Sequence, residues 1–230
     1  MKASHHPTDD LLLDYGAGNT DEAQSLLIAT HLALCPRCRG IVENAETLGG
    51  ALIDAAPATA MAEDALESVL SRLDEPDDSA EQVEPPHPMT EPVPATAEAA
   101  ISIPRPLRDY LAGGSTDALS WRRVAPGIQR HTLTVESEGK TSSAYLLKLA
   151  PETVIPHHGH HGEEMTLVLE GGFTDAGQHF VRGDVEQADP DVDHQPVVDP
   201  DGPCLALVVT DAPLRFTGLL PRLLQPILDR

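Results

Sequence analysis

The sequence is short of cysteine, of basic residues and of long apolar runs. Its 230 residues include three cysteines and 15 Lys and Arg against 37 Asp and Glu, a formal net charge of −22. The few cysteines agree with a reducing compartment. The acidic balance argues against direct binding of DNA or RNA and favours a basic protein partner, unless it serves only solubility. No apolar run approaches a membrane span and the polar start MKASHHPTDD does not resemble a signal peptide, so we expect a cytoplasmic protein.

Two of the cysteines lie in HLALCPRC, residues 31–38, with the spacing H-x3-C-x2-C. On a helix, His31 and Cys35 share one face, one turn apart. Pro36 predicts that the chain turns just after Cys35 and that a new helix begins there, which brings Cys38 back toward Cys35. Structural zinc sites take four nitrogen or sulfur ligands, and this motif supplies three of them.

The fourth ligand is absent from the motif itself. His5 and His6 are the nearest candidates, and the spacing does not choose between them. A redox-active C-x2-C pair and an inert buried pair are the alternatives to zinc. The redox alternative is disfavoured because no strand precedes the motif and its flanks are helical in pattern.

Periodicity predicts four short helices over residues 1–74. The first spans 8–15 with Thr8 as its cap, and the second begins at Asn19 with Glu22 in a capping-box position and runs to the motif. The third runs from Cys38 to Leu52, and the fourth spans 61–73. So small a core often needs a metal, so we expect zinc to contribute folding energy. The fourth helix carries an apolar row that either docks on a partner or completes the bundle: Leu66, Val69, Leu70 and Leu73.

Composition divides the rest of the chain. Residues 75–100 hold seven acids, six prolines and no Lys or Arg, which is typical of an extended linker. From Trp121 onward, short β-type segments separated by Gly, Pro and Asp predict a sandwich or barrel. The apolar tail 219–228 either packs on it or is an exposed docking segment. We therefore predict three parts, 1–74, 75–104 and 105–230, with separable end domains.

A second group of metal-ligand residues lies in PHHGHHGEEMTLVLEGG, residues 156–172. On a strand, His158, His160 and Glu164 have the same parity and converge on one interior point. His194, on an adjacent strand, is a candidate fourth ligand. Three imidazoles and a carboxylate suit zinc, iron, manganese or nickel. Three neighbours have the opposite parity and are expected to face solvent or to support the ligands: His157, His161 and Glu163.

The alternative for this group is a surface histidine patch that binds metal loosely. His131 and His179 fit ordinary strand histidines better than ligands. Cys204 lies in an apolar strand and is expected to be an unreactive core thiol.

The spacing H-x-H-x3-E-x6-G, with His158, His160, Glu164 and Gly171, resembles the first cupin motif. The stretch from Gly183-Asp184 to His194 resembles a shortened second motif, although the usual P-x-G-x2-H is absent. Together with HLALCPRC, this order of motifs resembles the ChrR type of zinc-binding anti-sigma factors over nearly the whole chain, the linker excepted.

The resemblance implies a fold, two zinc sites and a partner. The fold would be a zinc-stabilised all-α helical bundle followed by an all-β cupin-like barrel, a jelly roll. The helical domain would hold an extracytoplasmic-function group sigma factor in the cytoplasm, and the cupin-like domain would sense singlet oxygen or related oxidants and trigger release. No catalytic residue is implied. The first zinc would be bound by His6, His31, Cys35 and Cys38. The second would be bound by His158, His160, Glu164 and His194.

Two other functions remain as alternatives. One is a cupin-type metalloenzyme, a dioxygenase, isomerase or hydrolase, with a helical appendage, in which the second site polarises a substrate or activates oxygen. The other is a metal-storing or metal-sensing module, which would show weak, exchangeable metal and no protein partner.

Overall fold

The computed structural model describes residues 3–73, 103–111, 114–135, 142–212 and 214–216. The chain divides into two compact units, one within residues 1–50 and 101–230 and the other within 51–100. Most of the predicted linker and the whole tail 219–228 lie outside the described residues. None of the helices in the described ranges is long and apolar enough to span a bilayer.

The first two helices begin at side-chain caps. Helix α1 (Asp9–Gly16) starts after Thr8, whose hydroxyl accepts a hydrogen bond from the amide of Leu11, as predicted. Helix α2 (Glu22–Leu34) is capped by Asp21 in a capping box with Gln24. The predicted cap at Asn19 was wrong, because the carboxylate of Asp21 satisfies the same free amides one residue before the helix.

Helix α2 ends at Leu34 with Cys35 as its C-cap, and helix α3 (Pro36–Ala55) begins directly afterwards, where Pro36 was expected to start it. Helix α3 continues through Gly49 and Gly50. Helix α4 (Ala65–Arg72) is shorter than the predicted 61–73, and helix α5 (Arg105–Arg108) is a single turn.

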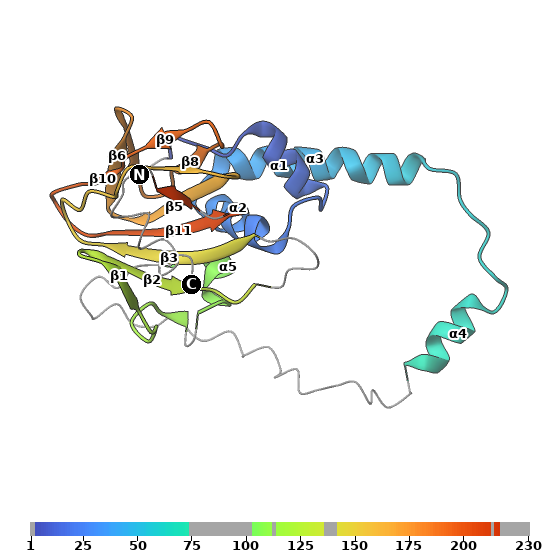
Figure 1. Ribbon diagram of the computed structural model, residues 1–230. Helices are drawn as coiled ribbons and strands as arrows, with labels where there is room; N and C mark the ends of the chain where they lie inside the picture. The colour runs from blue at the N-terminus through green and yellow to red at the C-terminus, as the bar shows by residue number, and fades with distance from the viewer. Residues whose placement is uncertain (1–2, 74–102, 112–113, 136–141, 213, 217–230) are drawn as a thin grey trace. The chain divides into compact units, whose positions relative to one another are not determined.

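The described strands of the first unit form three antiparallel sheets, and most of the strands are labelled in Figure 1. The first has the order β1-β2-β3-β11-β5-β8, the second β10-β6-β7 and the third β12-β4-β9. The strands are β1 (Arg122–Ala125), β2 (Ile128–Thr132), β3 (Ser143–Leu149), β4 (His158–His160), β5 (Glu164–Glu170), β6 (Gly172–Asp175), β7 (Gln178–Val181), β8 (Val185–Ala188), β9 (Asp193–His194), β10 (Val197–Val198), β11 (Cys204–Thr210) and β12 (Leu214–Phe216).

The six-stranded sheet is covered on both faces. In β11 every residue is buried, and alternate residues belong to different clusters. Leu205, Leu207 and Val209 pack in a core with α2 and α5, whereas Ala206 and Val208 lie on the opposite face. Burial on two faces explains why this strand is a continuous apolar run instead of an alternating one.

Helix α2 packs into the same core as the sheet. Its residues Ala23, Leu26 and Leu27 share one hydrophobic cluster with Leu107 of α5 and with residues of β3, β5 and β11. A hydrogen bond adds to this packing: the hydroxyl of Tyr110 donates to the carboxylate of Glu22 at 2.7 Å. Helix α2 therefore shares a core with the β-region, although the N-terminal helices also have a cluster of their own around Leu12, Ile28 and Val42. The boundaries 1–74, 75–104 and 105–230 remain a prediction.

Candidate metal centres

The N-terminal cluster forms where three segments meet. His6 lies in the extended segment before α1, His31 in the last turn of α2, Cys35 at its end and Cys38 in the first turn of α3. One ligand atom from each lies within 4.8 Å of the others. The Nδ1 atom of His6 is 3.5 Å from the sulfur of Cys35 and 3.4 Å from that of Cys38. Tetrahedral zinc with ordinary bond lengths requires about 3.6 Å between a nitrogen and a sulfur ligand, so the spacing fits this ion.

The structure brings His6 into this cluster, and His5 turns away from it. The ring of His5 packs on Phe180, with 4.4 Å between ring centroids, and its Nδ1 lies 3.4 Å from the carboxylate of Asp184. Of the two candidates that the spacing left open, His6 is the one positioned as a ligand.

The hydrogen bond of His31 fixes which of its nitrogens is free for a metal. The carbonyl of Gly183 only accepts, so His31 Nδ1–H must donate to it, at 2.8 Å. The Nε2 atom is then a buried lone pair with no hydrogen-bond partner among the described residues. Burial lowers the pKa of His31 to about 4, so the ring stays neutral at physiological pH. A neutral imidazole with one nitrogen anchored and the other free is the form that binds metals.

The thiols are buried close together. Burial, and then the neighbouring Cys35, raises the pKa of the Cys38 thiol to about 12. A bound cation reverses such a shift, because a metal-coordinated thiol is deprotonated outright. Two buried thiols and two histidines make a donor set that suits zinc.

The second cluster lies inside the β-region, where β4 and β9 pair. His158 and His194 are direct partners in the antiparallel register, and His160 follows on β4. The Nε2 atom of His194 is 3.1 Å from that of His158 and 3.0 Å from that of His160. One carboxylate oxygen of Glu164 completes a group within 4.8 Å.

The hydrogen bonds of two of these rings leave lone pairs facing each other. His158 Nδ1–H donates to the carbonyl of Pro156 at 2.9 Å, and His194 Nδ1–H donates to the carboxylate of Asp175 at 2.9 Å. Both Nε2 atoms are then acceptors with no proton between them, an arrangement that a cation stabilises. Burial, and then repulsion from His194, lowers the pKa of His158 to about 4, so protonation of His158 does not readily supply that positive charge.

The side chains converge as the parity predicted, but not on a single strand. His158 and His160 lie on β4, whereas Glu164 begins β5 in a different sheet, after a break at residues 161–163. Burial raises the pKa of Glu164 to about 7. A cavity of about 30 Å³ adjoins the cluster, enough for a water or an ion and far below the volume of an ordinary substrate pocket.

Two carboxylates beside this cluster were missed by the sequence reasoning. Asp175 accepts from His194, and Glu186 Oε1 lies 3.9 Å from the same nitrogen. Burial, and then Asp175, raises the pKa of Glu186 to about 8. These two with His194 form a third ligand group. The only signal in the sequence is an acid within each otherwise ordinary strand segment, which does not identify its partner.

The remaining predictions for this region agree with the structure. The side chains of opposite parity, His157, His161 and Glu163, are exposed. Cys204 is fully buried, and burial raises its pKa to about 12, as expected of a core thiol. Neither strand histidine joins a ligand group among the described residues: His131 is hydrogen-bonded to the carbonyl of Ser120, and His179 pairs with Asp199.

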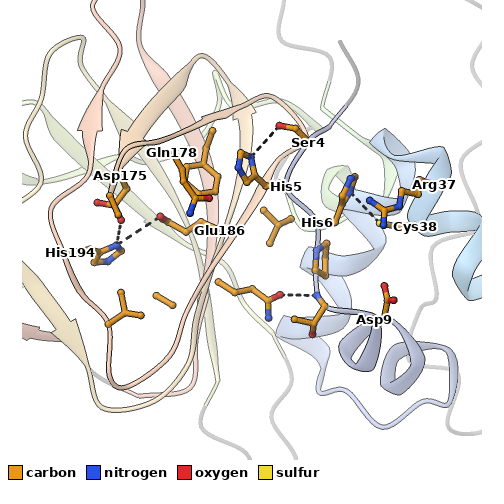
Figure 2. A pocket seen from close by; sticks show the side chains of 18 of the residues that line it. Ser4, His5, His6, Asp9, Arg37, Cys38, Asp175, Gln178, Glu186 and His194 are labelled. Carbon is orange, nitrogen blue, oxygen red and sulfur yellow. Dashed lines mark hydrogen bonds and ion pairs between the residues drawn. The ribbon is translucent and has the colours of Figure 1, made fainter.

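One open pocket of about 560 Å³ is lined by members of both clusters. Figure 2 shows His6 and Cys38 on one side of it and Asp175, Glu186 and His194 on the other. The N-terminal segment that carries His5 and His6 forms part of its wall, so the two candidate metal centres border one cavity.

Comparisons with known proteins agree with both halves of the chain. Residues 112–213 match a family model described as the ChrR cupin-like domain. The anti-sigma-E factor ChrR of Cereibacter sphaeroides is 38% identical over 226 residues, which are 98% of each chain. The crystal structure of Rhodobacter sphaeroides SigE in complex with the anti-sigma ChrR matches with a TM-score of 0.73 and 34% identity, over 91% of this chain and 100% of that one.

These matches confirm the fold class, helices followed by a cupin-like β-domain. They also decide against the metalloenzyme alternative, because the relative that aligns end to end is a regulator. The chain belongs to the ChrR family of anti-sigma factors.

Proposed function

We propose that this chain sequesters an extracytoplasmic-function group sigma factor through its N-terminal helices, which a zinc ion at His6, His31, Cys35 and Cys38 organises. The relative with a matching structure was crystallised with SigE, which supports a partner of this class. A net charge of −22 suits a partner whose surface must carry positive charge to meet promoter phosphates.

The observation that carries the proposal is the set of exposed apolar side chains on α3 and on α4. On α4, Leu66 and Leu70 are 69% and 52% exposed, and on α3, Leu52 and Ile53 are 66% and 77% exposed. Helix α4 has no buried residue. Large apolar side chains repeated on helix surfaces are typical of a protein-binding site.

Binding is tested by co-expressing the full chain with a candidate sigma factor and measuring co-purification. The double substitution Leu66→Glu and Leu70→Glu should abolish the complex, because it places charges where the apolar contact forms. Glu67→Gln, on the same helix, is the matched control and should leave the complex intact. Full retention of the sigma factor by the double variant would contradict this docking surface.

Zinc is expected to organise the binding surface. Cys35→Ala or Cys38→Ala should remove metal and sigma binding together, since the metal holds the start of α3 against α2 and the N-terminal segment. Metal analysis beside the co-purification assay checks this. A variant without zinc that bound sigma with unchanged affinity would separate the two properties.

The cupin-like domain is proposed to bind a second zinc at His158, His160, Glu164 and His194 and to sense singlet oxygen or a related oxidant. One of these ligands, His194, lines the 560 Å³ pocket, which supports access of small molecules to that side of the site. Light and a photosensitiser, applied to the purified complex, should release sigma from the wild type and not from His160→Ala. Equal release from both would place the sensor elsewhere, with the Cys35 and Cys38 thiolates as the next candidates.

A further inference from the structure

The turn between β7 and β8 binds the backbone of the N-terminal segment. The amides of Ser4 and His5 both donate to one oxygen of the Asp184 carboxylate, at 2.6 and 3.0 Å. The amide of Val185 donates to the carbonyl of His5 at 3.2 Å. These bonds fix the two residues immediately before His6.

The same turn also holds a second candidate ligand. The carbonyl of Gly183 accepts from His31 Nδ1–H at 2.8 Å, which aims the other ring nitrogen toward the cluster. Gly183 has a φ of +95°, a conformation that other residues rarely adopt. A Cβ on it would lie 3.6 Å from Ala3 and 3.7 Å from Leu34, so the turn lies against both the N-terminal segment and the end of α2.

Asp184 is suited to hold the segment firmly. Its side chain is fully buried, and its second oxygen accepts from the amide of Val181 at 3.0 Å, which fixes the carboxylate within its own turn. Hydrogen bonds to an ionised acceptor are stronger than neutral ones. An aspartate so placed anchors the backbone before His6 to the cupin-like domain.

We propose that Gly183 and Asp184 of the cupin-like domain position the N-terminal metal site, so that this domain sets how firmly His6 and His31 hold the metal. The inference rests on the proposed metal site and adds to it a role for residues far along the chain. Asp184 is a positioning residue, since it acts through the segment that carries His6. Loss of such outer contacts typically costs about 10- to 100-fold in metal affinity.

The test uses the full chain loaded with cobalt(II) in place of zinc. Among the ligand groups of the described residues, the N-terminal cluster alone contains thiols, so thiolate-to-cobalt absorption reports that site and not the histidine and carboxylate site. The rate at which this absorption decays after excess chelator is added measures how fast the N-terminal site releases cobalt.

Three variants are compared with the wild type. Asp184→Ala should release cobalt about 10- to 100-fold faster, because we expect the affinity lost with such contacts to fall on the dissociation rate. Asp184→Asn should fall between it and the wild type, because one amide oxygen still accepts from the segment. Asp199→Ala is the matched control, since Asp199 is an ion-paired acid of the same domain that bonds His179 at 2.7 Å, and it should release cobalt at the wild-type rate.

The possible failures are distinguishable. Unchanged release from Asp184→Ala, with a normal thiolate band, would overturn the inference and leave the metal site standing. Equally fast release from Asp199→Ala would also overturn it, since the effect would then be general destabilisation. No thiolate band in the wild type would overturn the metal site and the inference with it. If Asp184→Ala does not fold, release from Asp184→Asn at the wild-type rate overturns the inference and faster release supports it.

Discussion

Replacing Leu27 by alanine should destabilise the β-region although Leu27 lies on α2. The side chain is fully buried in a cluster that joins α2 and α5 to strands β3, β5 and β11. Truncating such a leucine typically costs about 2–5 kcal/mol of unfolding free energy. A cost of about 3 kcal/mol lowers the melting temperature by about 6–12 °C in a chain of this size.

The sole tryptophan makes the assay specific. Trp121 lies next to β1 and packs against the same cluster, so its fluorescence reports the loss of packing on the β-region side of that core. Thermal melts followed by Trp121 fluorescence and by far-ultraviolet circular dichroism should move down together in Leu27→Ala. Leu13→Ala, the same substitution at a side chain 48% exposed on α1, should stay within about 0.5 kcal/mol of the wild type.

The refuting result is a split between the two probes. If circular dichroism showed an early loss of helix while the Trp121 midpoint stayed at the wild-type temperature, α2 would unfold without the sheet. The shared core would then not couple the two regions. The sequence-based expectation of separable halves would regain its support.

The carboxylates around the second site give two further predictions. Asp175→Asn should weaken metal binding at the cupin-like site by about 10- to 100-fold, because Asp175 accepts a hydrogen bond from Nδ1–H of His194. Equilibrium competition with a chelator measures the affinity, and Asp199→Asn is the control. Chelator-stripped protein should lose stability as the pH rises from 6.5 to about 8 in denaturant titrations. Burial raises the pKa of Glu164 from 4.5 to about 7 and that of Glu186 from 4.5 to about 8, so the stability that these carboxyls contribute when protonated is lost as the pH rises through these values. The pKa values of His31 and His158 are lowered from 6.5 to about 4, and these two groups oppose the trend only below pH 6.5. A flat or rising stability over that range would contradict the burial of these carboxyls.

The sequence predicted local features well because their causes are local. Thr8 caps α1 by bonding an amide three residues on, and Pro36 starts α3 because it lacks an amide proton. The choice of Asp21 over Asn19 as the cap of α2 was missed, since both residues suit the role and only the path of the preceding loop decides between them.

Features that join distant segments were predicted only in part. Parity grouped His158, His160 and Glu164, but their convergence depends on a break in the chain that passes from one sheet to another. Asp175 and Asp184 act on residues 19 and 180 positions away. A single acid in a strand segment does not indicate which distant residue it will contact, so neither contact could be predicted from the sequence pattern.

The two candidate metal centres belong to one structural unit, and this bears on how a signal at one reaches the other. Strand β8 begins next to Asp184, which holds the segment before His6, and two residues later carries Glu186 beside His194. An interface made of a continuous strand, buried hydrogen bonds and a shared core does not deform gradually. A change of ligands at the histidine site that displaced β8 would therefore act on the backbone before His6 directly, without requiring motion of the linker.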